Sequence, residues 1–221
     1  AGAAPDRSSG EPDAGERSPA GQGTNGRLTV LLLAVMTFLA ALVSDAPASW
    51  SGVYLRDLGA DAAVAASGYA AFSAGEVVTR LINDRLVNRL GWVRLIRTGT
   101  LCCAAALTAA LLIGEPGIAL AAFVVAGAGI SAVFPGTFTA AGALPRPALA
   151  MGQLGFAGNL GWLLVSPLIG GLATLAGLPA ALGVLAVAAL LITALAPNTR
   201  PPPPASPAHA DRRRPTRSVE S

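Results

Sequence analysis

Six stretches of apolar residues alternate with short polar connections along this chain. Each stretch is close to the ~20 residues that an α-helix needs to cross the hydrocarbon core of a bilayer. The pattern predicts transmembrane helices over residues 28–49, 61–83, 91–113, 117–140, 149–173 and 177–196. The expected fold class is therefore all-α, a polytopic membrane protein whose six transmembrane helices form one domain over residues 27–197.

Arginines give this arrangement a direction. The run from Glu76 to Arg97, EVVTRLINDRLVNRLGWVRLIR, carries five arginines between two apolar stretches. The positive-inside rule places such a connection in the cytoplasm. Alternation of six spans then puts 14 of the 15 arginines on the cytoplasmic side and Arg56 alone on the other. We expect a multi-pass protein of the inner (plasma) membrane with both termini cytoplasmic, since a dual-topology protein would need a near-even count.

Composition agrees with a membrane protein. Hydrophobic residues make up 53% of the 221 residues and charged residues only 12%, whereas a soluble domain carries about 25% charged residues. The net charge of +3 does not indicate a nucleic-acid partner, because the arginines flank apolar spans and lack neighbouring aromatic residues for base stacking. The lipid bilayer is the partner that this composition predicts.

The two ends of the chain are polar. Residues 1–26 are rich in Gly, Ala, Ser and Pro, which predicts a disordered cytoplasmic linker. They lack the apolar segment of a signal peptide, so we do not expect one here. The absence of an initiator Met suggests that residue 1 is not the natural beginning of the gene product. Residues 198–221 predict a disordered Pro/Arg-rich cytoplasmic tail, either a simple solvated tail or an electrostatic tether to anionic lipid.

Residues for catalysis are scarce. The single histidine, His209, lies in the tail, so no membrane-embedded histidine can act as a general base or metal ligand. The adjacent Cys102 and Cys103 point in different directions on a helix and predict neither a disulfide nor a metal site. No phosphate-binding GxxxxGK[ST] loop occurs. We expect no enzyme activity, no metal and no cofactor, apart from the option of proton coupling.

Glycines mark two of the predicted helices. Gly127 and Gly129 lie on the fourth span, and four glycines at three-residue spacing lie on the fifth: Gly152, Gly155, Gly158 and Gly161. Small residues let membrane helices approach closely. They predict thin helices that either pack statically or slide and bend against their neighbours.

Polar side chains at membrane depth are the candidates for a substrate or coupling site, because their burial in lipid is costly. The candidates are Asp45, Trp50, Glu76, Gln153, Asn159 and Trp162. Simpler interpretations remain for most of them: a wet helix end for Asp45, an ion pair with Arg80 for Glu76, and hydrogen bonds between helices for the two amides.

Three runs of sequence carry a resemblance to a known family. AFSAGEVVTRLINDRLVNRLGWVRLIR (71–97) resembles the second copy of the motif found in the cytoplasmic loop between helices eight and nine of major facilitator superfamily (MFS) transporters. SWSGVYLRDLGA (49–60) and SAVFPGTFTAAGALP (131–145) resemble a bacterial subgroup of sugar- and drug-type permeases related to YbjJ and fucose permease. The positions that match the motif are Asp84, Arg85, Arg89, Gly91 and Arg94.

The resemblance implies the C-terminal six-helix half of a twelve-helix permease, built from two inverted three-helix repeats. It implies a small-molecule substrate, alternating access, and a partner that is an N-terminal six-helix half or a second copy. Asp84 and the motif arginines would form a cytoplasmic gate, and Glu76 or Asp45 would couple transport to protons. A six-helix scaffold or assembly subunit without transport, or a non-functional fragment of a longer permease, remains an alternative.

Overall fold

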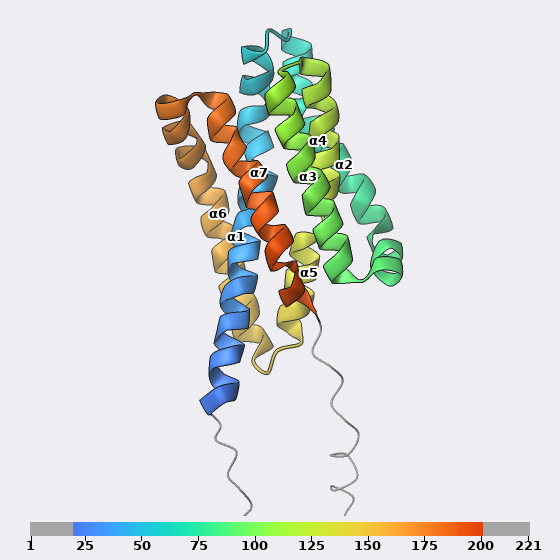
Figure 1. Ribbon diagram of the computed structural model, residues 1–221, viewed down its shortest axis with the longest axis vertical. Helices are drawn as coiled ribbons and strands as arrows, with labels where there is room; N and C mark the ends of the chain where they lie inside the picture. The colour runs from blue at the N-terminus through green and yellow to red at the C-terminus, as the bar shows by residue number, and fades with distance from the viewer. Residues whose placement is uncertain (1–19, 201–221) are drawn as a thin grey trace, which may run out of the picture.

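The computed structural model describes residues 20–200, and this part of the chain is entirely helical apart from short links. The helices are α1 (Ala20–Asp57), α2 (Ala62–Leu90), α3 (Trp92–Ile113), α4 (Pro116–Ile130), α5 (Val133–Gly142), α6 (Pro147–Ala176), α7 (Leu178–Leu195) and the short 3-10 helix η1 (Ala196–Thr199). They run up and down one bundle, so that the start of α1, the α2–α3 link, the α5–α6 link and η1 lie toward the same end (Figure 1). The all-α prediction is confirmed.

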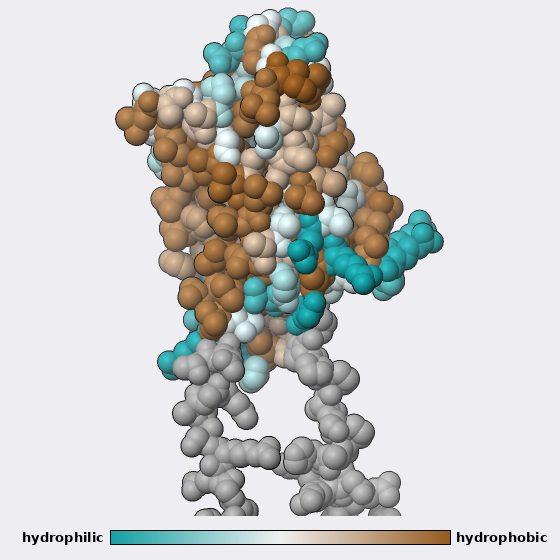
Figure 2. Space-filling model, in the orientation of Figure 1, coloured by the Kyte–Doolittle hydropathy of each residue, from teal (hydrophilic) through white to brown (hydrophobic). Residues whose placement is uncertain are grey.

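Hydropathy is distributed as in a membrane protein. Five segments are long and apolar enough to cross a bilayer: Gly26–Asp57, Trp92–Ile113, Pro116–Gly142, Pro147–Ala176 and Leu178–Thr199. Hydrophobic surface covers the middle of the face in Figure 2, and hydrophilic surface gathers toward its two ends. The second expected span, α2, is not among the five, because its second half carries charged residues from Glu76 to Arg89.

The chain ends of the domain differ slightly from those expected. α1 begins at Ala20, within the predicted linker, and η1 reaches Thr199, beyond residue 197. Residues 1–19 and 201–221, where the rest of the predicted linker and tail would lie, are outside the described residues.

The prediction of a connection around Trp50 and Tyr54 is wrong. α1 continues through Pro47 to Asp57, and Tyr54 is buried inside the bundle. Proline removes one backbone hydrogen bond of a helix, but membrane helices tolerate it when other groups satisfy the freed carbonyls. The bond that Pro47 removes is the one to the Val43 carbonyl. The Ser51 hydroxyl donates to the Pro47 carbonyl one turn later, and the helix continues beyond it to Asp57.

The arginine-rich connection is also helical rather than a loop. Arg80 and Arg85 lie inside α2 and Arg89 lies in its last turn, while Arg94 and Arg97 lie in the first two turns of α3. The single residue between these helices is Gly91. Gly91 has φ of +74°, a conformation that is readily adopted only by glycine, and its N–H donates to the Val87 carbonyl at 2.8 Å. One glycine therefore makes the whole reversal of chain direction.

The fourth expected span is interrupted. α4 ends at Ile130 and α5 begins at Val133. Pro135 has no N–H with which to bond the carbonyl of Ser131 four residues earlier, so the regular hydrogen bonding of the helix fails at this point. Together the two helices still form one membrane-length segment, Pro116–Gly142.

Glycines bring α4 into direct backbone contact with both of its neighbours. A Cβ on Gly127 would collide with the Phe72 carbonyl of α2, and one on Gly129 would collide with the Gly99 carbonyl of α3. The reciprocal glycines, Gly75 and Gly99, lie against α4 in the same way. The prediction of close approach at Gly127 and Gly129 is confirmed, and their glycine partners were not expected.

On α6 the glycine prediction holds for only two of four positions. Gly161 lies against the Phe38 carbonyl of α1, which a Cβ would approach to 2.7 Å, and Gly158 lies against Thr37 at 3.4 Å. Gly152 and Gly155 have open space where a Cβ would be. The close approach predicted for this helix is therefore confined to the stripe that faces α1.

Hydrogen bonds also join the helices in the core. The Thr37 hydroxyl donates to Thr137 at 3.2 Å, linking α1 to α5, and the hydroxyls of Thr100 and Thr193 lie 2.7 Å apart, linking α3 to α7. The buried Tyr54 hydroxyl donates to the Ala110 carbonyl of α3 at 2.8 Å. These bonds satisfy polar groups that the apolar core cannot.

We expect Tyr54→Phe to lower the free energy of unfolding by about 1 kcal/mol, since the bond to the Ala110 carbonyl is lost while the ring is kept. Unfolding in mixed detergent micelles measures this. The matched control is Tyr69→Phe, because Tyr69 is exposed on α2 and makes no hydrogen bond within residues 20–200. Equal stability of the two variants would show that the Tyr54 bond contributes nothing net.

Candidate functional site

The face of α6 that packs on α1 is narrow, so most of α6 is exposed. Its buried residues follow one stripe: Ala150, Leu154, Gly158, Gly161, Val165 and Ile169. The spacing of three and four residues keeps this stripe on one side of the helix. The other side chains of α6, and those on the adjoining edge of α1, are mostly exposed and available for contact with another molecule.

Contacts between α1 and α6 bring Asp45 and Trp162 to the same level. The two helices run in the same direction (Figure 1). Gly161 lies against the α1 backbone at residue 38, and further along the Ser166 hydroxyl donates to Ser49 at 3.3 Å. Asp45 lies between these two contacts on α1, as Trp162 does on α6. Asp45 is half-buried and forms no ion pair with any other described residue.

Trp162 is the largest side chain on this surface. It is 48% exposed, and its ring lies 6.0 Å from that of Phe134 on α5, tilted by 31°. Asn159, about one turn earlier on α6, is also exposed, and its amide nitrogen donates to the Gly155 carbonyl at 2.8 Å. We call the set Asp45, Ser49, Asn159, Trp162 and Ser166 the α1/α6 polar face.

This face can recognise a small solute that is partly polar and partly apolar. A carboxylate, hydroxyls and an amide oxygen supply hydrogen-bonding groups, and an aromatic ring supplies a flat apolar surface. Ligand sites are usually lined by hydrophobic and aromatic side chains with a few polar groups. The same surface in contact with lipid would leave the Asp45 carboxylate poorly solvated.

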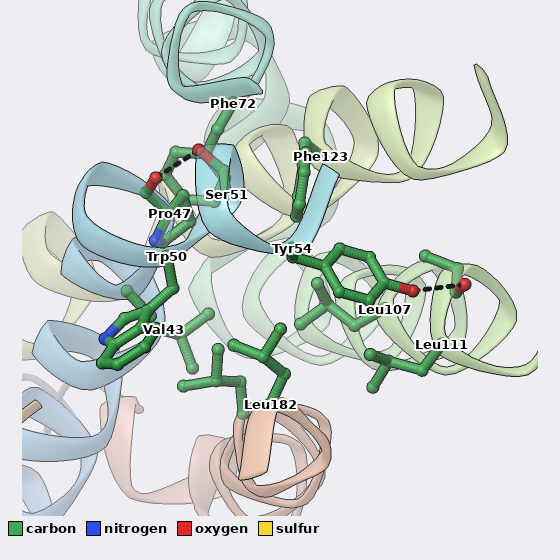
Figure 3. Close-up of a pocket in the computed structure, with 13 residues that line it drawn as sticks. Val43, Pro47, Trp50, Ser51, Tyr54, Phe72, Leu107, Leu111, Phe123 and Leu182 are labelled. Atoms are coloured by element: carbon green, nitrogen blue, oxygen red, sulfur yellow. Dashed lines mark hydrogen bonds between the residues drawn. The ribbon is translucent and has the colours of Figure 1, made fainter. Parts of the chain in front are cut away.

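Trp50 belongs to a neighbouring interior region rather than to the open face. Its ring lies against Gly170, where a Cβ would be 3.5 Å away, and its indole nitrogen is buried without a hydrogen-bond partner among the described residues. Trp50 and Tyr54 border a cavity of about 20 Å³ (Figure 3). That volume holds at most a single water, so the cavity is too small for a solute.

Two other predicted site residues lie apart from the α1/α6 polar face. Glu76 on α2 is half-buried and accepts a hydrogen bond from Arg80 at 3.2 Å, the ion pair that its spacing allowed. Gln153 is exposed in a groove at the arginine-rich end of α6, where Arg27 and Arg146 also lie. It is about 9 Å along the helix from Asn159.

The five motif residues lie where α2 meets α3. Asp84, Arg85 and Arg89 are exposed on the second half of α2, Gly91 forms the link, and Arg94 is exposed in the first turn of α3. Within residues 20–200 none of their side chains forms a hydrogen bond or ion pair. The charged members are therefore available to groups outside the described part of the chain.

Sequence reasoning did not identify three residues at the α1/α6 polar face. They are Ser49 and Ser166, which belong to it, and Phe134, which contacts Trp162. A signal was available for Ser166: Asn159, Trp162 and Ser166 follow one another at spacings of three and four residues, which places all three on one side of the helix. Phe134 gave no such signal, because its contact with Trp162 depends on how α5 packs against α6.

Membrane-length apolar helices in one bundle, with a polar and aromatic face at membrane depth, define a multi-pass membrane protein. Residues 33–220 match the family model described as Major Facilitator Superfamily, and the chain belongs to this family of membrane transport proteins. The resemblance to the major facilitator superfamily is thus confirmed, whereas the YbjJ- and fucose-permease-type subgroup and the C-terminal half stay predictions.

Three relatives support the assignment. An uncharacterized MFS-type transporter of Yersinia pestis is 34% identical over 170 residues, which are 76% of this chain and 44% of that protein. Membrane protein MosC of Rhizobium meliloti is 29% identical over 69% of this chain and 38% of its own length. Uncharacterized transporter y4wD of Sinorhizobium fredii is 32% identical over 52% of this chain and 30% of its own. The chain spans less than half the length of these relatives.

Proposed function

We propose that this chain is the C-terminal six-helix half of a secondary active MFS permease that moves a small solute by alternating access. The observation that carries the proposal is the α1/α6 polar face: exposed hydroxyls, an amide and a tryptophan lie beside a half-buried carboxylate on membrane-length helices of a transporter family member. Such a face needs a partner other than lipid. A solute bound between two halves is the partner that this family architecture provides.

The sixth membrane helix in this proposal is α2. It is 29 residues long, and its first half is apolar enough to lie in lipid. Its glycine contacts with α4 are as close as any in the bundle. The charged second half of α2 then lies at the membrane surface, in the cytoplasm by the positive-inside rule. Both termini are proposed to be cytoplasmic, in the inner membrane.

The glycine contacts support two inverted three-helix repeats, α1–α3 and α4–α7. Gly75 lies against the Val124 carbonyl, and Gly161 lies against the Phe38 carbonyl. Gly161 is 86 residues after Gly75, and Val124 is likewise 86 residues after Phe38. The two contacts therefore join equivalent positions of the two proposed repeats. The matched helices run in opposite directions, α2 against α6 and α1 against α4 (Figure 1), as an inverted repeat requires.

The missing partner in this proposal is an N-terminal six-helix half, or a second copy of this chain, covering the α1/α6 polar face. The solute is sugar-like or drug-like, in keeping with the resemblance to YbjJ- and fucose-permease-type transporters. Trp162 would stack on its flat surface while Asn159 and the two serines bond its polar groups. Asp45 is preferred over Glu76 as the proton-coupling carboxylate, because Glu76 is already paired with Arg80.

We expect Trp162→Ala in the longer permease to raise the KM for uptake about two- to tenfold, since an aromatic contact contributes about 0.5–1.5 kcal/mol beyond its buried area. The measurement is uptake into proteoliposomes with an imposed pH gradient, using a panel of labelled sugars and drug-like solutes. The matched control is Leu163→Ala, because Leu163 is exposed on a different side of α6.

Two outcomes would contradict the proposal. One is a wild-type protein that accumulates none of the panel. The other is a pair of variants, Trp162→Ala and Leu163→Ala, that change KM to the same extent, because the effect would then reflect general disturbance of α6 rather than contact with a solute.

A further inference from the structure

A second open feature lies at the arginine-rich end of the bundle, distinct from the α1/α6 polar face. It is a groove of about 1100 Å³ between the beginning of α1 and the beginning of α6. We call it the α1/α6 groove. α1 contributes Arg27, Val30 and Leu31, and α6 with its preceding link contributes Arg146, Leu149 and Phe156.

The charge in the groove has one sign. Arg27 and Arg146 line it, and no acidic side chain is among the described residues that do. Both arginines are exposed, and neither forms an ion pair or side-chain hydrogen bond within residues 20–200. Two unpaired guanidinium groups on one groove provide complementary charge for a phosphate, which arginine binds through paired N–H donors.

The walls of the groove are apolar and exposed. Leu31 is 59% exposed, Leu149 is 57% exposed and Phe156 is 72% exposed. These side chains follow the arginines into the membrane-spanning part of each helix, so the groove is charged at the bundle end and apolar deeper in. Phe156 is about 15 Å beyond Arg146, as measured by the rise of an α-helix.

This order of charge and apolar surface matches one kind of molecule, a lipid whose phosphate lies at the membrane surface and whose acyl chains extend inward. Basic pockets between membrane helices on the cytoplasmic side bind anionic head groups in this way. A protein segment would need acidic residues at one end and a bare apolar remainder to match the groove equally well. Gln153, between the arginines and Phe156, also lines the groove and adds an amide that can hydrogen-bond a lipid ester.

We propose that the α1/α6 groove binds an anionic phospholipid, with its phosphate on Arg27 and Arg146 and its acyl chains on Leu31, Leu149 and Phe156. The site is independent of the transported solute and of the proposed gate. It assigns Gln153 to lipid contact instead of to solute recognition.

The test is native mass spectrometry of the purified full chain in detergent with phosphatidylglycerol or phosphatidylcholine added. Wild type should retain phosphatidylglycerol in preference to phosphatidylcholine. In the double variant Arg27→Gln/Arg146→Gln, the preference for phosphatidylglycerol over phosphatidylcholine should be about thirtyfold weaker, because two arginine contacts with the anionic lipid are removed. The control, Arg56→Gln/Arg97→Gln, removes the same charge at exposed arginines outside the groove and should behave as wild type.

Two further variants separate charge from shape. Arg27→Lys/Arg146→Lys keeps the charge and should retain most of the preference, whereas Phe156→Ser should weaken retention of phosphatidylglycerol with the arginines intact. Competition by inorganic phosphate alone should be ineffective.

Any of three results would overturn the lipid assignment: equal retention of the two lipids by wild type, an unchanged preference in the glutamine pair, or full displacement by inorganic phosphate. The first two would leave the groove as a contact surface for another protein segment. The third would make it a site for a soluble phosphate.

Discussion

Replacing Gly127 with alanine is expected to destabilise the protein by about 3 kcal/mol or more. The new methyl group would overlap the Phe72 carbonyl of α2. Overpacking against movable side chains costs about 1–3 kcal/mol, and here the obstacle is backbone on both sides, so α2 and α4 must separate along their length. Unfolding in mixed micelles measures the loss, and reduced yield of folded protein in membranes should accompany it.

The chain offers a matched control for this change. Gly152→Ala introduces the same methyl group into a membrane helix of the same bundle, where nothing lies within 4 Å of the new atom. Its stability should remain within about 0.5 kcal/mol of wild type. If Gly152→Ala were as damaging as Gly127→Ala, helix propensity or expression would explain both, and the close α2–α4 contact would lose its importance.

Asp84→Ala is expected to reduce uptake by the longer permease more than tenfold. In the proposed gate, Asp84 accepts charge-assisted hydrogen bonds in one of the two transport states only, and such bonds contribute about 1.5–3 kcal/mol. Losing them shifts the balance between the states by tenfold or more. The exposed position of Asp84, with no partner among residues 20–200, is consistent with a partner elsewhere in the longer protein.

The control for the gate is Asp57→Asn, an exposed carboxylate at the opposite end of the bundle, which should leave uptake unchanged. Proteoliposome uptake should be accompanied by cysteine-accessibility labelling of each side of the membrane. Unchanged uptake and labelling in Asp84→Ala would remove the gating role from the α2–α3 link and leave its arginines as determinants of topology alone.

The pattern of apolar residues was sufficient to place the helices but not their ends. Each of the six expected spans contains the body of one or two observed helices. The errors arose at Pro47, where proline and polar neighbours indicated an end although the helix continues to Asp57, and at the arginine run, where a concentration of charge was interpreted as a loop between helices. Charge determines which residues meet water and does not by itself stop a helix.

The candidate site was predicted in part. Asn159 and Trp162 are exposed on α6, and Asp45 is half-buried on the adjoining part of α1; that they form a substrate or coupling site stays a prediction. Glu76 and Gln153 lie elsewhere. Ser49, Phe134 and the glycine partners of α4 were missed, since each owes its importance to a contact with another helix, and such contacts depend on the relative rotation of helices that a single sequence does not specify.

The glycines that hold α4 between α2 and α3 also determine how this half of the molecule can deform. At Gly75, Gly99, Gly127 and Gly129 the main chains are in contact, with no side chain between them that could change rotamer to accommodate a shift. We therefore expect α2, α3 and α4 to move together as one rigid unit. α6 packs on α1, α5 and α7, but it is the least buried of the five membrane-length segments and is therefore expected to move more freely. We therefore expect α6 to be more mobile than α4, so that spin labels on α6 report broader distance distributions than labels on α4.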